Sequence, residues 1–373
     1  MRHLSNIYRL GVKELWGLAR DPMLIFLIVF TFTFSTYTAG TSMPETISNA
    51  PLAVIDEDDS QLSKRILSAF YRPLFEVTEI ALDQADKGMD DGVYTFVLDI
   101  PPSFQSDVLA GRVPDIQLNV DATRMSQAFT GGGYIQQIAM EEITEFTQRY
   151  RSVQQLPVEL AVRMRFNPNL TQSWFGSLMD IINNVTMMAI VLTGTALIRE
   201  REHGTIEHLL AMPVTPAEIM ISKVWSMGLV VLVASGASLI FVVQGLIGVR
   251  IDGSIPLFMA GVALHLFATT AMGIFLATVA RNMPQFAMLL ILILMPLQML
   301  SGTSTPRESM PKMVQDVMQI APTTHFVEIA QGILYRGAGI DVVWKQFVLL
   351  AVIGGVLFFL SLVRFRNTIG QMA

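Results

Sequence analysis

The stretch Ile198–Glu218, I-R-E-R-E-H-G-T-I-E-H-L-L-A-M-P-V-T-P-A-E, lies between two long apolar runs and decides how the rest of the chain is interpreted. Gly204 is placed to end the preceding helix with a left-handed C-cap, after basic residues that suit the negative end of the helix dipole. Thr205 can then cap a short helix that Pro213 ends. Thr215-Pro216-Ala217-Glu218 has the pattern of a capping box that opens the next helix. The stretch therefore predicts a short amphipathic helix between two membrane spans. Its apolar residues are Ile206, Leu209 and Leu210.

The composition is that of a membrane protein. Of 373 residues, 52% are hydrophobic and only 15% are charged, whereas roughly a quarter of the residues of soluble domains are charged. The absence of cysteine excludes disulfides, iron–sulfur clusters and thiolate zinc sites. A net charge of −6 gives no basic footprint for nucleic acid. The sequence has no Gly-x-x-x-x-Gly-Lys-Ser/Thr motif, so we expect no nucleotide or other cofactor bound by this chain.

Six apolar runs are long enough to cross a bilayer core of about 30 Å. The first, residues 22–44, follows a helical pattern over residues 2–20 whose apolar stripe and basic residues suit a helix in the membrane interface. A cleaved signal peptide is the competing interpretation of the first run, but the run is long for one. The other five runs are residues 174–198, 224–249, 253–280, 282–306 and 346–363. We expect a polytopic α-helical membrane protein with about six transmembrane helices.

Residues 45–172 differ from the rest, because charge rises and short apolar runs alternate with helical patterns. This alternation predicts a small α/β domain between the first and second spans. The expected strands are residues 52–55, 75–80, 93–100 and 116–120. Gly131-Gly132-Gly133 is expected to form a flexible break before one or two helices in residues 134–165.

The acidic run Asp56–Ser60 allows two interpretations, a calcium site or a strand end followed by a helix cap. Its spacing lacks the glycine and the distal glutamate of a calcium loop. A cap by Asp59 or Ser60 is therefore favoured, and no metal site is expected.

Basic residues place both termini and the Ile198–Glu218 stretch on the cytoplasmic side. When residues 45–172 are left out, ten basic residues lie on the same side of the membrane as the N-terminus and five lie on the opposite side. The first set is Arg2, Arg9, Lys13, Arg20, Arg199, Arg201, Lys223, Arg281, Arg364 and Arg366. The second set is Arg250, Arg307, Lys312, Arg336 and Lys345. The α/β domain is then expected outside the cytoplasm.

In this topological position, the stretch resembles the coupling helix of ABC-2-type transporter permeases, which are membrane subunits driven by a separate cassette ATPase. The matching residues are Glu200, Arg201, Glu202, Gly204, Thr205, Glu207, Leu209, Leu210, Pro213 and Val214. Residues of the α/β region resemble the drug-export branch of the same family: Val54, Asp56, Asp58 and Ser60, then Ile100, Pro101, Pro102 and Phe104, then Gly111, Arg112 and Asp121. Taken alone, the stretch also fits an ordinary capped cytoplasmic loop.

The resemblance implies the permease subunit of an exporter in the bacterial inner membrane, without catalytic residues of its own. ATP and Mg would be bound by the partner ATPase, which would contact residues 204–213 and the N-terminal helix. A second permease subunit, identical or paralogous, is implied as well, and drug-export relatives suggest a periplasmic adaptor and an outer-membrane channel. The implied organisation is an interfacial helix at 1–21, a first span at 22–44, a periplasmic domain at 45–172, the remaining spans within 173–366 and a cytoplasmic tail at 367–373.

Polar residues in or beside the spans have two open interpretations, a substrate route or hydrogen bonding between helices. They are Asp180, Asn183, Asn184, Gln244, His265 and Gln298. The turn-rich segment 303–343 is external in the expected topology, and the family resemblance implies that it forms a lid over the pathway. The lid residues are Pro306, Pro311, Pro322 and His325.

A membrane receptor whose external α/β domain binds a ligand is the alternative from another class. Six spans and short cytoplasmic segments argue against it. An intramembrane enzyme is a third hypothesis, but no nucleophile–base arrangement is visible, and His203 and His208 have the wrong spacing for a metalloprotease helix. The substrate is left open among drugs, lipids, peptides and polysaccharides.

Overall fold

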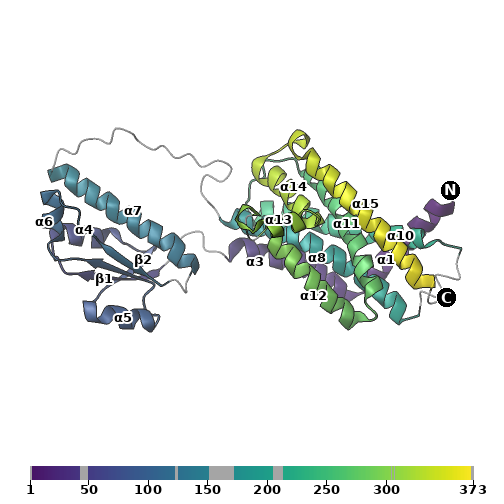
Figure 1. The fold of residues 1–373 in the computed structure, drawn as a ribbon, viewed down its shortest axis with the longest axis horizontal. Coiled ribbons are helices and arrows are strands. Elements are labelled where there is room, and N and C mark those ends of the chain that lie inside the picture. Colours follow the sequence, from purple (N-terminus) through teal and green to yellow (C-terminus); the bar gives the residue numbers. More distant parts are fainter. Residues whose placement is uncertain are drawn as a thin grey trace. The chain divides into compact units, whose positions relative to one another are not determined.

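The computed structural model describes residues 2–42, 49–121, 125–150, 172–204, 213–303, 305 and 307–370. The chain divides into two compact units (Figure 1), one of Pro44–Arg163 and the other of Met1–Met43 with Met164–Ala373. The first unit contains a β-sheet with helices, and the second is helical. Because helices dominate and several of them could cross a membrane, the prediction of a polytopic helical protein is confirmed.

The α/β unit is built on a four-stranded sheet in the order β2-β1-β3-β4. Its strands are β1 (Ala50–Asp56), β2 (Phe75–Glu79), β3 (Phe96–Ile100) and β4 (Gln117–Val120). β1 pairs in parallel with β2 and β3, and β4 pairs antiparallel with β3. Crossovers between parallel strands are right-handed, and the connections β1→β2 and β2→β3 run in opposite directions across the sheet. The connecting helices α4 (Gln61–Ala69) and α5 (Leu82–Asp90) therefore cover opposite faces.

Alternate residues of the strands fill the two faces of this sheet. Leu52, Phe96 and Leu98 pack against α4, α6 (Phe104–Ala110) and α7 (Met125–Tyr150), whereas Ala53 and Val97 pack against α5. Figure 1 shows α4, α6 and α7 on one side of the strands and α5 on the other.

The prediction of a flexible break at residues 131–133 was wrong, because these glycines lie inside the continuous helix α7. A Cβ added at Gly131 would lie 2.2 Å from the Phe96 ring. The glycine thus allows the helix to pack closely on the sheet, and close packing is as good a reason for a glycine as flexibility.

Six helices of the described chain are long and apolar enough to cross a membrane. The first is Pro22–Thr41, which consists of α2 (Pro22–Phe30), η1 (Thr31–Ser35) and α3 (Thr36–Thr41). The others are Phe175–Glu202 (within α8, Gln172–Glu202), Pro216–Ile247 (α10, Pro216–Ala237, with η2, Ser238–Ile247), Ile255–Val279 (α11), Met283–Leu300 (α12) and Ile340–Asn367 (within α15, Ile340–Gly370). The N-terminal helix α1 (Arg2–Ala19) precedes them, as expected. The first span begins with a local cap, in which the Asp21 carboxylate accepts the backbone N–H of Met23 and Leu24 at 3.1 Å and Pro22 is the first helical residue.

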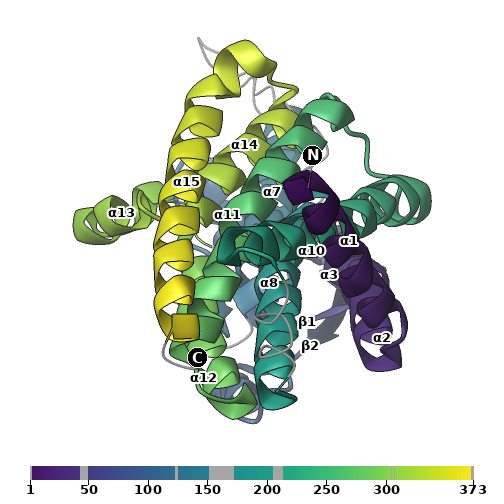
Figure 2. The same ribbon diagram turned by 90° about the vertical axis from the view of Figure 1, so that its right-hand side faces the viewer.

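Helices α8 and α11 form the centre of the helical unit, and most of α12 and α15 is exposed at its edge. Figure 2 looks along the unit and shows α15 and α12 outside α11. Small residues bring the central helices together, since a Cβ added at Gly273 of α11 would lie 2.8 Å from the Ile190 carbonyl oxygen of α8. Such close approach is typical of membrane helices, which associate by packing rather than by the hydrophobic effect.

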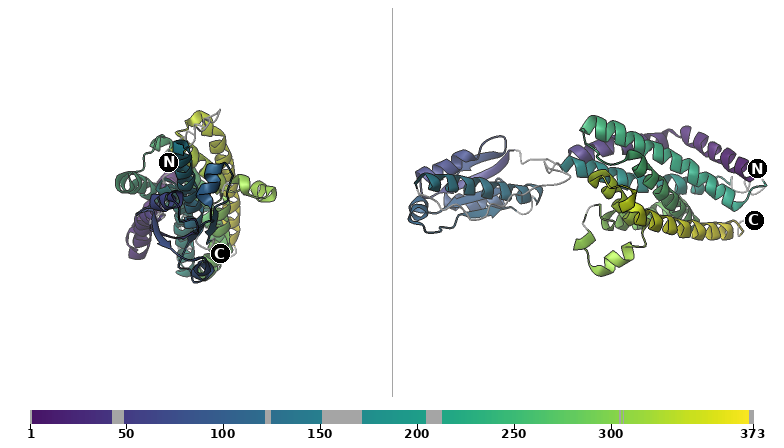
Figure 3. Two further views of the ribbon diagram at one scale, coloured as in Figure 1. Left: turned by 90° about the vertical axis from the view of Figure 1, so that its left-hand side faces the viewer. Right: turned by 90° about the horizontal axis from the view of Figure 1, so that it is seen from above.

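Two further helices, α13 (Lys312–Met318) and α14 (Pro322–Arg336), lie between the fifth and sixth spans. They lie within residues 303–343, which the sequence predicts to be a turn-rich external segment, and α14 is largely buried. Figure 3 shows them at one end of the helical unit, whereas α1 and the C-terminal end of α15 lie at the other.

Candidate functional site

The two helix ends that flank the predicted coupling helix have the expected caps. Gly204 adopts a left-handed conformation, with φ of +68°, after the end of α8. Thr215 and Glu218 form a reciprocal capping box at the start of α10, and Pro216 is its first residue. The coupling residues Thr205, Ile206, Glu207, Leu209 and Leu210 lie outside the described residues, so their predicted helix stays a prediction. Pro213 is described and lies just before α10.

Two of the predicted coupling residues attach the end of α8 to the connection between α11 and α12. The Arg201 guanidinium donates hydrogen bonds to the backbone oxygens of Ala277 and Ala280 at the end of α11, at 2.9 and 2.5 Å. The Glu202 carboxylate accepts the backbone N–H of Met283, at the start of α12, at 2.9 Å. Both contacts satisfy backbone groups that helix ends leave unpaired, so Arg201 and Glu202 fix helices here rather than project freely.

The N-terminal helix supplies a second attachment of α8. Lys13 Nζ donates to Glu200 Oε1 at 3.2 Å, and Glu200 also contacts Lys223 of α10. Arg199 forms an ion pair with Asp21, just after α1, and this hydrogen bond lowers the pKa of the Asp21 carboxyl. The end of α8 is therefore bound to the N-terminal segment on two sides.

Helix α1 also packs along the start of α10. Glu218 Oε1 lies 2.9 Å from His3 Nδ1 and accepts a hydrogen bond from Asn6 at 3.2 Å. Trp225 donates to the Ile7 carbonyl at 3.2 Å and stacks on the Tyr8 ring, with ring centres 6.2 Å apart. The sequence placed α1 in the interface but contained no signal for these partners, because they are more than 200 positions away in the chain.

Among the polar residues of the spans, Asp180 and Asn184 form one cluster with the first span. The Asp180 carboxylate accepts hydrogen bonds from Ser35 at 3.1 Å, Thr36 at 3.1 Å and Asn184 at 2.6 Å. Asn184 also donates to the Thr31 carbonyl at 3.1 Å. Each of these donors to the carboxyl group is a neutral side chain.

This cluster lies at a π-helical turn, η1 (Thr31–Ser35), which the sequence did not predict. A second π-helical segment, η2, ends the third span and packs against η1 and α3. Single π turns within α-helices are frequently found at functional sites. The Thr31 carbonyl accepts a hydrogen bond from Asn184, so a residue far away in the sequence contacts the turn.

The other polar residues of the spans do not join the cluster. His265 is fully buried, contacts Thr186 Oγ1 through Nε2 at 2.9 Å and stacks on Phe326, with ring centres 4.1 Å apart. These contacts connect α8, α11 and α14, which favours helix packing over a substrate route at this residue. Asn183, Gln244 and Gln298 are half-buried on three separate spans.

At the opposite end of the helical unit, the predicted lid residues organise α13 and α14. Pro311 precedes α13, and Pro322 is the first residue of α14. His325 Nε2 donates to the Gln319 carbonyl at 2.8 Å and so joins the two helices. Pro306 lies outside the described residues.

Next to these helices is a polar cavity of about 580 Å³ between α8, α14, α15 and the segment after α12. Arg307 and Glu328 form an ion pair on its wall, and Gln346 donates to Glu328 at 3.1 Å. Arg336 and Glu308 also line it. The balance of charges and amides can bind a polar or amphipathic molecule. The cavity was not predicted, because it is formed by four separate segments.

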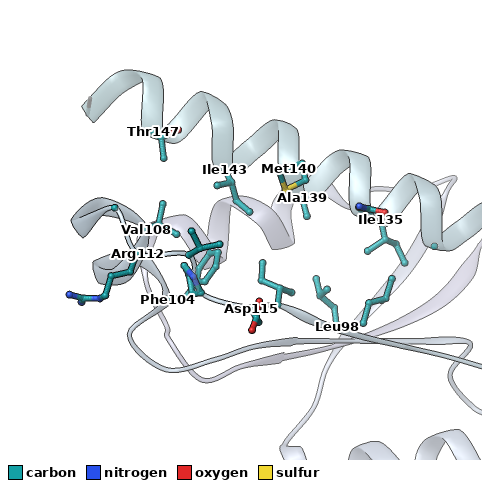
Figure 4. A pocket seen from close by; sticks show the side chains of 17 residues that line it. Leu98, Phe104, Val108, Arg112, Asp115, Ile135, Ala139, Met140, Ile143 and Thr147 are labelled. Carbon is teal, nitrogen blue, oxygen red and sulfur yellow. The ribbon is translucent and has the colours of Figure 1, made fainter. Parts of the chain in front are cut away.

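The α/β unit has a larger and more apolar pocket, of about 710 Å³, between α7, α6 and the segment leading to β4. In Figure 4, Ile135 and Ile143 of α7 face Leu98 and Phe104 across the space, whereas Arg112 points away from it. A lining of this kind suits a hydrophobic ligand or side chain.

The acidic run Asp56–Ser60 forms hydrogen bonds with nearby backbone groups, and Ser60 caps the next helix as predicted. Asp56 accepts the backbone N–H of Asp58 and Asp59 at 3.1 and 2.9 Å, and Ser60 caps α4. Asp58 accepts the backbone N–H of Gln105 at 3.0 Å. These carboxylates therefore stabilise turns and helix starts.

Comparison with known proteins identifies the class to which this arrangement belongs. Residues 22–363 match the family described as ABC-2 family transporter protein, so the chain belongs to that family. It is 63% identical, over all of both chains, to a protein of Escherichia coli (strain K12) named inner membrane transport permease YhhJ. It is 26% identical to the probable multidrug ABC transporter permease YbhR of the same organism, over 91% of this chain and 93% of the relative. The chain is therefore a multi-pass inner-membrane transport permease, and the family resemblance inferred from the sequence is confirmed.

Proposed function

We propose that the chain is the membrane-spanning subunit of an exporter driven by a separate cytoplasmic cassette ATPase, and that the ATPase contacts the connection between α8 and α10. The observation that carries this proposal is the attachment of both ends of the connection. Arg201 and Glu202 attach the end of α8 to α11 and α12. Glu218, at the start of α10, is held by α1.

Such attachments make the connection a suitable point for transmitting a force. A rigid connection passes a displacement to every helix bound to it, whereas a loop with free ends would absorb the displacement. A push on residues 204–213 would reach α1, α8, α10 and the α11–α12 corner together. In this proposal ATP and Mg bind to the partner, and this chain supplies motion and pathway rather than catalysis.

The basic residues and the helix ends support the proposed side of the membrane for this connection. The connection joins α8 to α10 at the end of the helical unit that carries α1 and the C-terminal end of α15. The excess of basic residues at this end supports a cytoplasmic location for it. The α/β unit then faces the periplasm, where it is available to an adaptor and an outer-membrane channel, and a second permease subunit completes the pathway.

The cargo in this proposal is an amphipathic molecule. Two lines of support are the polar cavity near α14 and the Asp180 cluster, which give polar groups along an otherwise apolar bundle. A third is that a relative's name describes a probable multidrug transporter permease.

The proposal is tested by isolating the tagged chain from native membranes in mild detergent and identifying bound proteins by mass spectrometry. The test variant changes Ile206, Leu209 and Leu210 to Asp. The matched control changes three exposed apolar residues of or beside α13, at the opposite end, to Asp. They are Met313, Val317 and Ile320.

We expect an ATPase with Walker motifs to be recovered with the parent chain and the control but not with the test variant. Equal recovery with all three would place the contact elsewhere. Recovery of a kinase or regulator without any ATPase would refute the proposal and favour a receptor.

A further inference from the structure

The residue that stands out beyond the matched motif is Lys223 of α10. Its side chain is only 2% exposed, although lysine is almost never fully buried unless it is paired. Its Nζ lies 2.8 Å from Glu14 Oε1 of α1 and 2.8 Å from Glu200 Oε2 of α8. One ammonium group therefore joins carboxylates from two other helices, of which α1 is far away in the sequence.

We propose that Glu14, Glu200 and Lys223, called here the Lys223 link, make α1, α8 and α10 move as one body when the partner ATPase acts on the connection. This inference rests on the proposed coupling at residues 204–213. Lys223 is in this view a positioning residue, because it acts through the helices it joins rather than on cargo or nucleotide.

The place of the link along the helices supports this role. Glu200 lies about one helical turn before Gly204, and Lys223 about two turns after Thr215. The link therefore ties together the two helices that enter and leave the connection, just inside their ends. Without it, the end of α8 and the start of α10 could separate under load, and a displacement of the connection would spread them instead of moving the bundle.

The charges around the link balance only as a set. Glu14 and Glu200 bring two negative charges, and Lys223 brings one positive charge. The second positive charge comes from Lys13, whose Nζ lies 3.2 Å from Glu200. The Lys13 side chain is 54% exposed, so water can take its place beside Glu200. The Lys223 side chain is only 2% exposed, so water cannot take its place in the same way. Burial raises the pKa of the Glu14 carboxyl, and the Lys223 charge opposes that shift.

Breaking a buried link by removing one partner leaves an uncompensated charge and can unfold the protein. Lys223→Met alone would therefore not separate coupling from folding. The double variant Glu14→Gln with Lys223→Met removes one charge of each sign and leaves the Lys13–Glu200 pair. Because the remaining charges are balanced, the double variant is expected to assemble without the Lys223 link, while the contacts of Glu218 and Trp225 still hold α1 against α10.

The chain has no cysteine, so one introduced cysteine gives an unambiguous reporter. Val342 is 61% exposed and lines the polar cavity near α14, at the far end of the helical unit. In the Val342→Cys background, the rate of maleimide labelling is measured on the complex with its native ATPase, with and without ATP plus vanadate. Recovery of the ATPase and its ATP hydrolysis are measured on the same samples.

We expect ATP plus vanadate to change the labelling rate of the parent several-fold. The double variant should retain the ATPase and its hydrolysis, yet show less than half of this change. Lys13→Met, the matched control, removes the exposed partner of the same Glu200 and should behave like the parent.

Three outcomes would overturn the inference: a full labelling change in the double variant, an equal loss in the Lys13→Met control, or no ATP-dependent change in the parent. A full labelling change in the double variant would mean that the Lys223 link has no role in coupling, although it could still stabilise the fold. If no ATPase is recovered with the parent chain, the proposed function itself fails, and the two failures are thus distinguishable.

Discussion

The contact of α1 with Trp225 can be tested by a substitution at Gly11. A Cβ added there would lie 2.0 Å from a carbon of the Trp225 ring, far inside van der Waals contact. The ring fills the space, so either it or the helix must move. Gly17 lies on the same helix, and a Cβ added there meets no described atom within 4 Å. Gly11→Ala and Gly17→Ala are therefore matched, and the gain in helix propensity of about 1 kcal/mol is common to both.

The difference between the two variants estimates the free energy with which α1 docks. Overpacking costs about 1–3 kcal/mol. Movement of Trp225 would also weaken its hydrogen bond to Ile7, about 0.5–1.5 kcal/mol, and its stacking on Tyr8, a similar amount. We expect Gly11→Ala to weaken docking by about 2–6 kcal/mol relative to Gly17→Ala, on the sum of these contributions.

Limited trypsin digestion in detergent measures this difference, because cleavage after Arg9 and Lys13 requires local unfolding of α1, and docking holds the segment helical. When opening is fast relative to cleavage, the cleavage rate follows the open population. At 1.4 kcal/mol per factor of ten, cleavage of Gly11→Ala should be faster by about 30-fold or more. Equal cleavage rates for the two variants would refute the conclusion that α1 is bound to α10 through Trp225.

Two further predictions use matched glycines in the same way. Gly131→Val should destabilise the α/β unit because the added side chain collides with Phe96. Gly132→Val should not, because a Cβ there meets no described atom within 4 Å. Hydrogen exchange of the sheet amides measures the difference between the two variants. Gly273→Val should separate α8 from α11 and lower the melting temperature in detergent. Gly355→Val on α15 should leave the melting temperature near the parent value. Equal melting temperatures of the two variants would contradict the close packing of α8 and α11.

Much of the fold could be predicted from the sequence because its signals are local. The caps at Ser60 and Thr215–Glu218 form as expected, and their donors and acceptors lie within three residues of each other. The six apolar runs correspond to the six candidate spans for the same reason, since length and apolarity decide them within one segment.

The parts that sequence reasoning missed depend on distant partners. The sequence suggests that Gly131 is flexible, because the Phe96 ring that requires a glycine there lies in a distant strand. The π turn at Thr31 depends on Asn184, 153 positions away. Lys223 counted only as a basic residue for topology, since nothing near it in the sequence shows that Glu14 and Glu200 meet it. Local pattern predicts elements, whereas buried polar contacts between elements require the fold.

The same distinction applies to the candidate site. Glu200, Arg201 and Glu202 were identified by a resemblance and were expected to face the ATPase. Their described contacts are with this chain, to α1, α10 and the α11–α12 connection. The apolar residues within the segment 204–213 are thus the more direct candidates for contact with the ATPase. Glu200, Arg201 and Glu202 hold the ends of the flanking helices in place.

The central claim is that the connection between α8 and α10 is where the ATPase binds, and photo-crosslinking in living cells tests it most directly. A photoreactive amino acid replaces Leu209 in one strain and Met313, the exposed residue of α13, in another. After irradiation, adducts are identified by mass spectrometry. The account predicts an adduct with a Walker-containing ATPase from the Leu209 position and none from the Met313 position. An ATPase adduct from both positions, or from neither, would contradict it.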